Sequence, residues 1–215
     1  MSLPLTDLIA LVGVNLVCCA ILLRLLSLVH LARQAVGWCV LGCFALLWLP
    51  AGAAQLPLVA YIRGVSSDLS FTLVLLACMG LAQGLFGFVL AGKREYTAVF
   101  VAVASAAVFL YPMALGWGDW DAYRPGWGSA AMWAVLLGVC VLAWLVGLRV
   151  LPLLIALALL AWTAGLLESS NLWDYLLDPW LVIVSFFQCA SCGIGHLKKR
   201  LQRVRSRATH DVLPD

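Results

Sequence analysis

The sequence predicts an all-α protein, a polytopic transmembrane helical bundle of about seven spans with its N-terminus outside the membrane and its C-terminus inside. Three observations lead to this prediction. Of the 215 residues, 65% are hydrophobic and 11% are charged, whereas a soluble domain is about half apolar and about one quarter charged. The apolar residues form runs of about 20, the length of a helix that crosses the hydrocarbon core. The basic residues gather in alternate loops, as on the cytoplasmic face of membrane proteins.

Charged or turn-forming residues divide the apolar sequence into seven runs. We expect a membrane-spanning helix in each, because about 20 residues at about 1.5 Å per residue cross about 30 Å of hydrocarbon. Asp178 followed by Pro179 is typical of a helix cap and first helical position, and Asp68 is placed to cap the third span. The predicted spans are Leu8 to Leu28, Ala35 to Ala54, Leu69 to Ala91, Tyr96 to Leu115, Ala130 to Leu148, Val150 to Leu167, and Pro179 to Leu197.

The shortest interruption separates the fifth span from the sixth and runs from Gly147 to Pro152. If the helix continued through it, residues 130–167 would form one helix of about 57 Å, far longer than the membrane is thick. We therefore expect a tight hairpin around Arg149. This hairpin also decides the topology, because without it the basic C-terminal segment would lie outside.

The distribution of charge supports the same topology, because short cytoplasmic loops accumulate Lys and Arg. Of the thirteen basic residues, only Arg63 and Arg124 lie in segments assigned to the outside. The basic residues assigned to the inside are Arg24, Arg33, Lys93, Arg94, Arg149, Lys198, Lys199, Arg200, Arg203, Arg205 and Arg207. The acidic residues assigned to the outside are Asp7, Asp68, Asp119, Asp121, Glu168, Asp174 and Asp178, seven of the ten.

We expect one transmembrane helical domain, residues 1–197, followed by a basic cytoplasmic tail, residues 198–215. Basic side chains near anionic headgroups contribute about 1 kcal/mol each, so the tail is expected to contact anionic lipids through Lys198, Lys199, Arg200, Arg203, Arg205 and Arg207. Nucleic-acid binding is not expected from so short a segment at a membrane surface. The short loops and the lack of an Asn-x-Ser/Thr sequon fit a bacterial inner (cytoplasmic) membrane.

The outer loops, residues 61–68, 116–127 and 168–178, hold the polar groups from which a site can be built. The candidate outer-face site consists of Arg63, Asp68, Asp119, Asp121, Arg124, Glu168, Asn171, Asp174 and Asp178. Arg63 and Arg124 suggest a clamp on an anionic group such as a lipid-linked phosphate, since a guanidinium donates two parallel hydrogen bonds. The acids would then coordinate metal or move protons. The simpler alternative is that both arginines pair with neighbouring acids.

The third outer loop has helical spacing of its polar and apolar residues, which predicts a short helix lying in the membrane interface. Asp174 and Asp178 would share one face, and the apolar residues Leu172, Trp173, Leu176 and Leu177 would enter the lipid. Two such carboxylates can hold a divalent cation or form an acid and base pair. The simpler interpretation is a solvated face that ends in a helix cap. No zinc spacing, calcium loop or cofactor fingerprint is present, so no metal site is predicted and no cofactor is identified.

Asp, Glu, Lys and Arg are absent from the middle of the predicted spans, which argues against an ion-coupled transporter. The neutral polar residues Asn15, Ser105 and Gln188 lie at similar depth, about 10 to 15 Å below the outer boundary. Hydrogen bonds among them would join the first, fourth and seventh spans. Gly80 and Gly84 form the small-xxx-small pattern found at helix dimer interfaces, although the pattern is common.

Three functions are compatible with these residues. The first is a non-catalytic inner-membrane component or partner subunit in envelope biogenesis, favoured because the outer face has no histidine and the spans have no central charge. The second is an enzyme acting on a lipid-linked or phosphorylated substrate at the periplasmic interface. The third is a facilitative transporter, which requires a polar path through the spans. The expected partners are the bilayer and either another membrane protein or a second copy of the chain.

Overall fold

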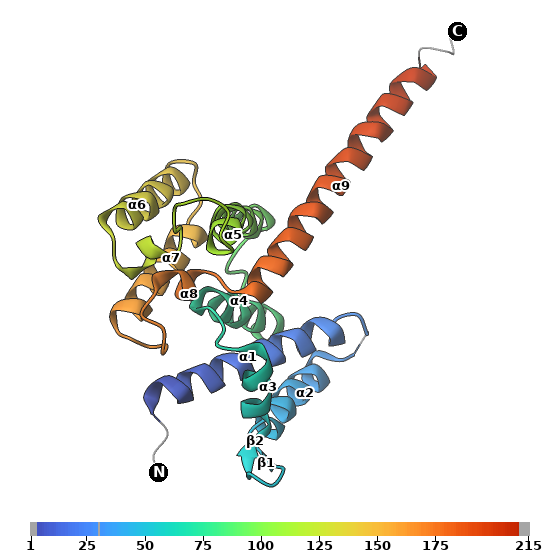
Figure 1. Ribbon diagram of the computed structural model, residues 1–215. Helices are drawn as coiled ribbons and strands as arrows, with labels where there is room; N and C mark the ends of the chain where they lie inside the picture. The colour runs from blue at the N-terminus through green and yellow to red at the C-terminus, as the bar shows by residue number, and fades with distance from the viewer. Residues whose placement is uncertain (1–3, 30, 211–215) are drawn as a thin grey trace.

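The computed structural model describes residues 4–29 and 31–210, and it is almost entirely helical (Figure 1). This confirms the all-α class. The described chain also contains one antiparallel hairpin, formed by β1 (Pro50–Ala51) and β2 (Leu56–Pro57). The helices are α1 (Leu5–Leu26), α2 (Arg33–Leu46), α3 (Leu58–Ser66), α4 (Phe71–Leu81), the π-helical turn η1 (Ala82–Phe86), α5 (Lys93–Ala114), the 3-10 turn η2 (Arg124–Trp127), α6 (Ala130–Leu145), α7 (Val150–Thr163), α8 (Leu172–Leu176) and α9 (Pro179–His210).

Each predicted span contains an apolar helix. Two of the described helices, α1 and α5, are long and apolar enough to cross a membrane. The other predicted spans contain the shorter apolar helices α2, α4 with η1, α6, α7 and the first part of α9, Pro179–Gly195. A helix of 14 residues such as α7 is about 21 Å long, less than the thickness of the hydrocarbon core. Crossing of the membrane by all seven helices therefore stays a prediction.

The second predicted span was too long. Helix α2 ends at Leu46, and the chain turns into the β1–β2 hairpin where the span was expected to continue to Ala54. Pro50 has no backbone N–H for the helical ladder, and Gly52 has a φ of +67° at the turn, which glycine adopts easily. The chain then enters α3, so Arg63 lies in a helix and not in the predicted loop.

The third predicted span is also shorter than expected. Ser70, and not Asp68, is the N-cap of α4, since its hydroxyl accepts a hydrogen bond from the Leu73 backbone N–H at 3.2 Å. At the other end, η1 stops at Phe86 because Gly87 takes a left-handed φ of +78°. The residues from Gly87 to Ala91, which we expected to be helical, have no regular secondary structure.

The tight hairpin predicted between the fifth and sixth spans is confirmed. Helix α6 ends before Gly147, whose φ is +77°, and α7 begins at Val150. The Leu148 backbone N–H donates to the carbonyl of Ala143 at 2.8 Å, which closes the end of α6. On the neighbouring helix, Arg94 donates from Nη2 to the carbonyl oxygen of Val146 at 2.6 Å.

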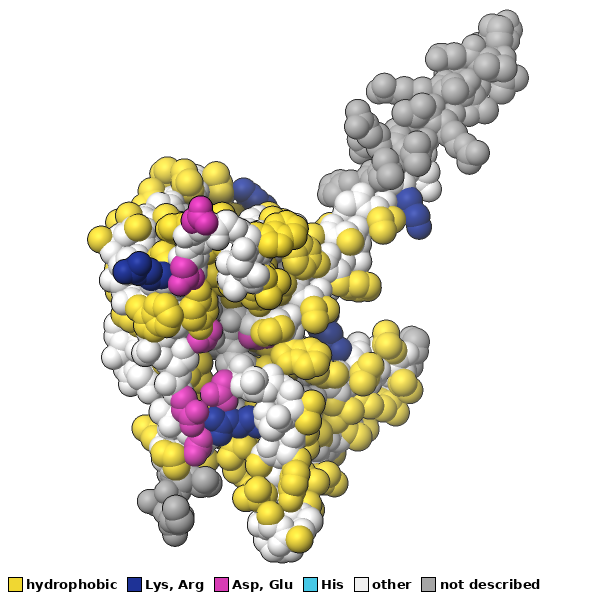
Figure 2. Space-filling view, in the orientation of Figure 1, with side chains coloured by type: hydrophobic (Ala, Val, Ile, Leu, Met, Phe, Trp, Pro, Cys, Tyr) yellow, Lys and Arg dark blue, Asp and Glu magenta, His cyan; other side chains and the backbone are white. Residues whose placement is uncertain are grey.

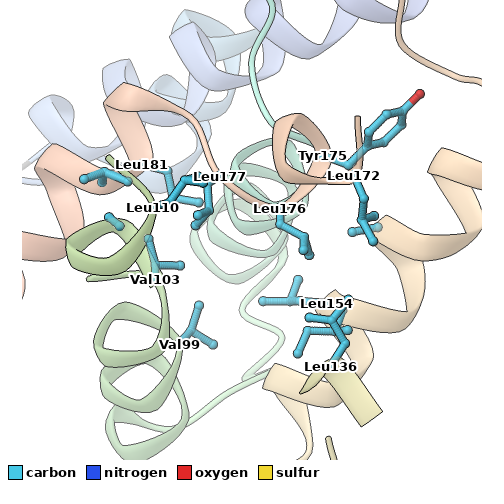
Figure 3. Close-up of a cluster of buried hydrophobic side chains, with 14 of the residues drawn as sticks. Val99, Val103, Leu110, Leu136, Leu154, Leu172, Tyr175, Leu176, Leu177 and Leu181 are labelled. Carbon is cyan, nitrogen blue, oxygen red and sulfur yellow. The ribbon is translucent and has the colours of Figure 1, made fainter. Parts of the chain in front are cut away.

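Helix α4 lies at the centre of the molecule and separates two sets of helices (Figure 1). On one side α1 packs against α4 and also contacts α2 and α3. On the other side α7 and α8 pack against α4, α5 and α6 each pack against α7, and α9 runs along α5. Figure 3 shows the core of this second set, where Val103 of α5, Leu154 of α7 and Leu181 of α9 meet the buried residues of α8.

The surface is unusually apolar, and large hydrophobic side chains cover much of the face in Figure 2. On α6, Leu142 and Trp144 are 66% and 65% exposed, and on α9 Phe187 is 71% exposed. A water-soluble monomer rarely exposes apolar patches of this extent.

The predicted tail belongs to a helix that continues without a break from Pro179 to His210, across the boundary predicted at residue 198. In this segment Lys198 is exposed. The predicted lipid contacts of Lys199, Arg200, Arg203, Arg205 and Arg207 lie outside the described side chains.

Candidate functional site

Arg63, in the last turn of α3, is the centre of an ion-pair cluster. Its Nη1 lies 2.6 Å from Asp7 Oδ1 at the start of α1, and its Nε lies 2.6 Å from Asp68 Oδ1. Its Nη2 lies 3.6 Å from Glu168 Oε1 in the segment that follows α7. The hydrogen bond to Asp68 raises the pKa of Arg63 above its ordinary value, against the opposing effect of burial. Arg63 thus pairs with neighbouring acids and joins three segments that are distant in sequence.

Asp178 connects the start of α9 to the start of α4. Its Oδ1 accepts a hydrogen bond from the Leu181 backbone N–H at 2.9 Å, which makes it the helix cap that the Asp178-Pro179 pair predicted. Its Oδ2 accepts from both the backbone N–H and the hydroxyl of Ser70, at 3.0 and 2.5 Å. Asp178 is 4% exposed, and three donors compensate for the loss of water around its carboxylate.

Asp174 connects the second outer loop to the third. The Tyr123 hydroxyl lies 2.6 Å from each carboxylate oxygen of Asp174, and the Ser169 hydroxyl also donates to this carboxylate. Burial first, and then the hydrogen bond to Asp174, raise the pKa of Tyr123 above its ordinary value. The phenol therefore stays protonated and acts as the donor in this contact.

A cavity of about 790 Å³ lies where these contacts meet. Its lining includes five of the nine predicted site residues, namely Arg63, Asp68, Glu168, Asp174 and Asp178, together with Asp7. Figure 2 shows Asp, Glu and Arg side chains around a hollow on this face of the molecule. Five carboxylates face one guanidinium, so the cavity carries an excess of negative charge.

The other four predicted site residues do not line this cavity. Asp119 and Arg124 are exposed. Asp121 folds its own loop, because its Oδ1 accepts a hydrogen bond from the Tyr123 backbone N–H at 2.9 Å. Arg124 does not line the cavity that Arg63 lines, so the structure does not bring together the two arginines of the hypothetical clamp.

Asn171, the fourth of these residues, has a structural place in the fold. It is the N-cap of α8, where its Oδ1 accepts from the Trp173 backbone N–H at 2.9 Å, and its Nδ2 donates to the carbonyl oxygen of Tyr123 at 3.1 Å. A Cβ on Gly126 would overlap Asn171 Oδ1 and lie 2.7 Å from Trp173 Cδ1. The sequence therefore needs glycine at this close approach.

The short helix predicted in the third outer loop is present as α8, but its environment differs from the prediction. Leu172, Leu176 and Leu177 are buried against residues of α5, α6 and α7, and do not reach the surface. In Figure 3, Leu172 and Leu176 lie above Leu154, and Leu177 lies beside Leu181. Because α4 and α7 pack over α8, its apolar face belongs to the core and not to the membrane interface.

The three neutral residues expected to join the first, fourth and seventh spans have different environments. Asn15 is fully buried and donates from Nδ2 to the carbonyl oxygen of Phe44 at 3.1 Å, so it joins α1 to α2. Ser105 is exposed beside an apolar cavity next to α5, and Gln188 is half-buried on α9. Asn15 lies on α1 and α2 packs against α1, so a carbonyl of α2 is within reach of the Asn15 side chain.

Sequence reasoning missed four residues of this network. Asp7 was noted only as an outer charge, Tyr123 and Ser169 were unassigned, and Ser70 was not recognised as a cap. A signal was present for Tyr123, because a tyrosine in a folded loop needs a partner for its hydroxyl. Asp7 carried no such signal, since its partner Arg63 is distant in sequence.

Among the described residues, no group of three or more His, Cys, Asp or Glu side chains is arranged to hold a metal ion. Comparison of the chain with family models, with curated proteins and with solved structures finds no match.

Proposed function

We propose that the protein is a seven-span component of a bacterial inner membrane, N-out and C-in, that serves as a non-catalytic structural or partner subunit in envelope biogenesis. The observation that carries this proposal is that the polar groups expected to do chemistry bond to one another. Arg63 pairs with acids from three segments, Asp174 accepts from Tyr123 and Ser169, and Asp178 accepts from α4. Each of these three residues bonds to a segment that is distant in sequence, which is what a structural role requires.

The apolar surface supports placement in the membrane. Leu142 and Trp144 on α6, and Phe187 on the Pro179–Gly195 part of α9, are exposed on segments without Asp, Glu, Lys or Arg. Contact of this area with water costs about 25 cal/mol per Å², and lipid or a partner helix removes that cost. The inner ends of the helices carry basic side chains that bond backbone carbonyls, as Arg33 does at Leu85 and Arg94 at Val146. This agrees with the inner position proposed for them.

The topology is tested with single cysteines in a variant whose eight native cysteines are replaced by serine. Asp119→Cys and Gln202→Cys change exposed positions in segments that the proposed topology assigns to opposite faces of the membrane. With the outer membrane permeabilised, an impermeant maleimide should label Asp119→Cys in intact spheroplasts and should label Gln202→Cys only after lysis. Labelling of Gln202→Cys in intact spheroplasts would refute the topology.

The absence of a catalytic role is tested with Glu168→Gln, because Glu168 is the most exposed of the paired carboxylates, with 60% of its side chain accessible. In cells that lack the gene, Glu168→Gln should restore the wild-type phenotype in full. Gentle detergent purification should also recover the same stoichiometric protein partner with wild type and with Glu168→Gln. Loss of function at normal protein level, with a bound phosphorylated lipid and no partner, would favour an enzyme.

The enzyme remains a second candidate because of the 790 Å³ cavity, which has the size of a ligand site and holds accessible carboxylates. Its charge disfavours the phosphorylated substrate first considered, since like charges in an interface repel and Arg63 is already paired. A facilitative transporter is less well supported, because it requires a polar path through the spans. A second cavity, which shares Leu177 with the first, is lined almost wholly by apolar side chains.

A further inference from the structure

The second cavity has a volume of about 470 Å³ and lies between α5 and α6, with α7 and α8 beneath it. The described residues that line it carry no charged group, and Thr72 and Ser105 supply the hydroxyls at its wall. The Thr72 hydroxyl already donates to the carbonyl oxygen of Tyr175 at 3.2 Å. The wall of the cavity therefore consists mainly of aliphatic and aromatic side chains. An apolar cavity of this size accepts an apolar ligand.

The cavity is elongated along α5. Its lining on this helix runs from Val99 to Phe109, a rise of about 15 Å. Along this wall the small residues Ala102 and Ala106 leave the space open. At the end near the outer loops, the Phe109 and Trp120 rings pack at 5.6 Å between centroids.

We propose that this cavity binds an acyl chain of a phospholipid, with the glycerol end at Trp120 and the methyl end toward Val99. This inference rests on the membrane position given under the proposed function. The orientation follows from the two ends of the cavity. Leu177 lines both this cavity and the polar cavity around Arg63, so the side of the cavity at α8 borders polar groups. The Val99 end is lined by apolar side chains such as Val139 and Leu151.

The volume of the cavity, about 470 Å³, fits a hydrocarbon chain better than a protein helix. A helix is about 10 Å wide with its side chains, so a 15 Å length of it occupies about 1,200 Å³. A chain about 4 Å wide, the contact distance between carbon atoms, occupies about 200 Å³ over the same length. The cavity therefore has room for an acyl chain but for less than half of a partner or second-copy helix.

The test uses the full-length protein in detergent and a phosphatidylcholine that carries a diazirine on its acyl chain. After photolysis, the labelled residues are mapped by mass spectrometry as the lipid is titrated. A diazirine at the chain terminus should label Val99 and Leu151, and a diazirine near the carbonyl should label Phe109 and Trp120. Labelling at both ends should saturate and be competed by unlabelled phosphatidylcholine.

Variants that fill the cavity provide the second arm. In Ala102→Phe with Ala106→Phe, we expect labelling of Leu136 to fall about tenfold, equivalent to about 1.4 kcal/mol of binding free energy. The matched control is Val101→Phe with Val108→Phe, on exposed positions of α5 that do not line the cavity, and it should label as wild type does. Val135→Trp fills the cavity from the exposed side of α6 and replaces the double variant if that one does not fold.

Three results would overturn the proposal: labelling that rises without saturation, labelling that is the same for both diazirine positions, or competition by a polyprenyl phosphate but not by phosphatidylcholine. The cysteine topology assay is read independently of the lipid. An inverted topology with saturable, position-dependent labelling would refute the proposed orientation in the membrane and leave the binding of the chain standing.

Discussion

Glu95 of α5 caps the N-terminus of α7, because its Oε2 accepts a hydrogen bond from the Val150 backbone N–H at 3.1 Å. The same carboxylate accepts from the Arg149 N–H at 3.0 Å. Helix α7 has no side-chain cap of its own, so a residue 55 positions away satisfies the free donors of its first turn. The hairpin on which the predicted topology depends is thus held by a neighbouring helix.

Replacing Glu95 with Ala should therefore destabilise the protein by about 1 kcal/mol, the usual effect of losing a helix cap. The measurement is the midpoint of unfolding by SDS titration of the purified protein in mild detergent. Asp119→Ala removes an exposed acid in a loop and serves as the matched control. Equal midpoints for the two variants would show that the Glu95 contact does not stabilise α7.

Replacing Arg63 with Gln should cost about 2 kcal/mol, because Asp7 and Asp68 would face each other without the guanidinium between them. This value is below that for a fully buried pair, since the Arg63 side chain is 20% exposed and water screens part of the interaction. Unfolding followed by tryptophan fluorescence measures it. Arg124→Gln, at an exposed position outside the cluster, should leave the free energy of unfolding within about 0.5 kcal/mol of wild type. A similar loss in both variants would contradict the structural role of Arg63.

Gly80 and Gly84 should respond in opposite directions to alanine. A Cβ on Gly84 would overlap Leu23 Cδ2 and lie 3.2 Å from Leu23 Cγ, so Gly84→Ala should separate α1 from η1 at a cost of about 1 to 3 kcal/mol. A Cβ on Gly80 meets nothing within 4 Å, so Gly80→Ala should stabilise α4 by about 0.5 to 1 kcal/mol. The same unfolding assay compares them, and a chemical cross-linking assay reports dimers. Loss of dimers in Gly80→Ala would instead assign this glycine to a helix interface.

Replacing Tyr123 with Phe removes the donor to Asp174 and should cost about 1.5 kcal/mol at pH 7, the value for a hydrogen bond to a charged group. The raised pKa of Tyr123 fixes the pH dependence of this difference. The contribution is complete below the unfolded pKa, about 10, and is lost as pH rises toward the higher folded pKa. The difference in unfolding free energy between wild type and Tyr123→Phe should therefore be constant up to about pH 10 and shrink between about pH 10 and pH 12. Tyr61→Phe, in which the lost hydroxyl bonds an exposed carbonyl, provides the control. A difference that stays constant over this pH range would refute the role of the Tyr123 proton.

The sequence alone was sufficient for the all-α class, for an apolar helix in each of the seven runs, for the hairpin at Gly147 and for the Asp178 cap. These features depend on local properties. Apolar run length, the freedom of glycine to take a positive φ and the capping geometry of an Asp-Pro pair act within a few residues. The errors at Ala54 and Ala91 arose where an apolar run continued past the end of its helix, because apolar composition alone does not mark a helix end.

The partners of the charged residues were decided by the tertiary structure. The sequence favoured an ion pair for Arg63 but left a phosphate clamp open. The packing of α1, α3 and the segment after α7 around it decided which acids pair with it. Likewise, the apolar residues of α8 were expected in lipid and lie in the core, because helical spacing identifies an apolar face but not what covers it. Composition and local spacing determined the helices, while long-range packing determined which polar groups are already bonded and which cavities stay open.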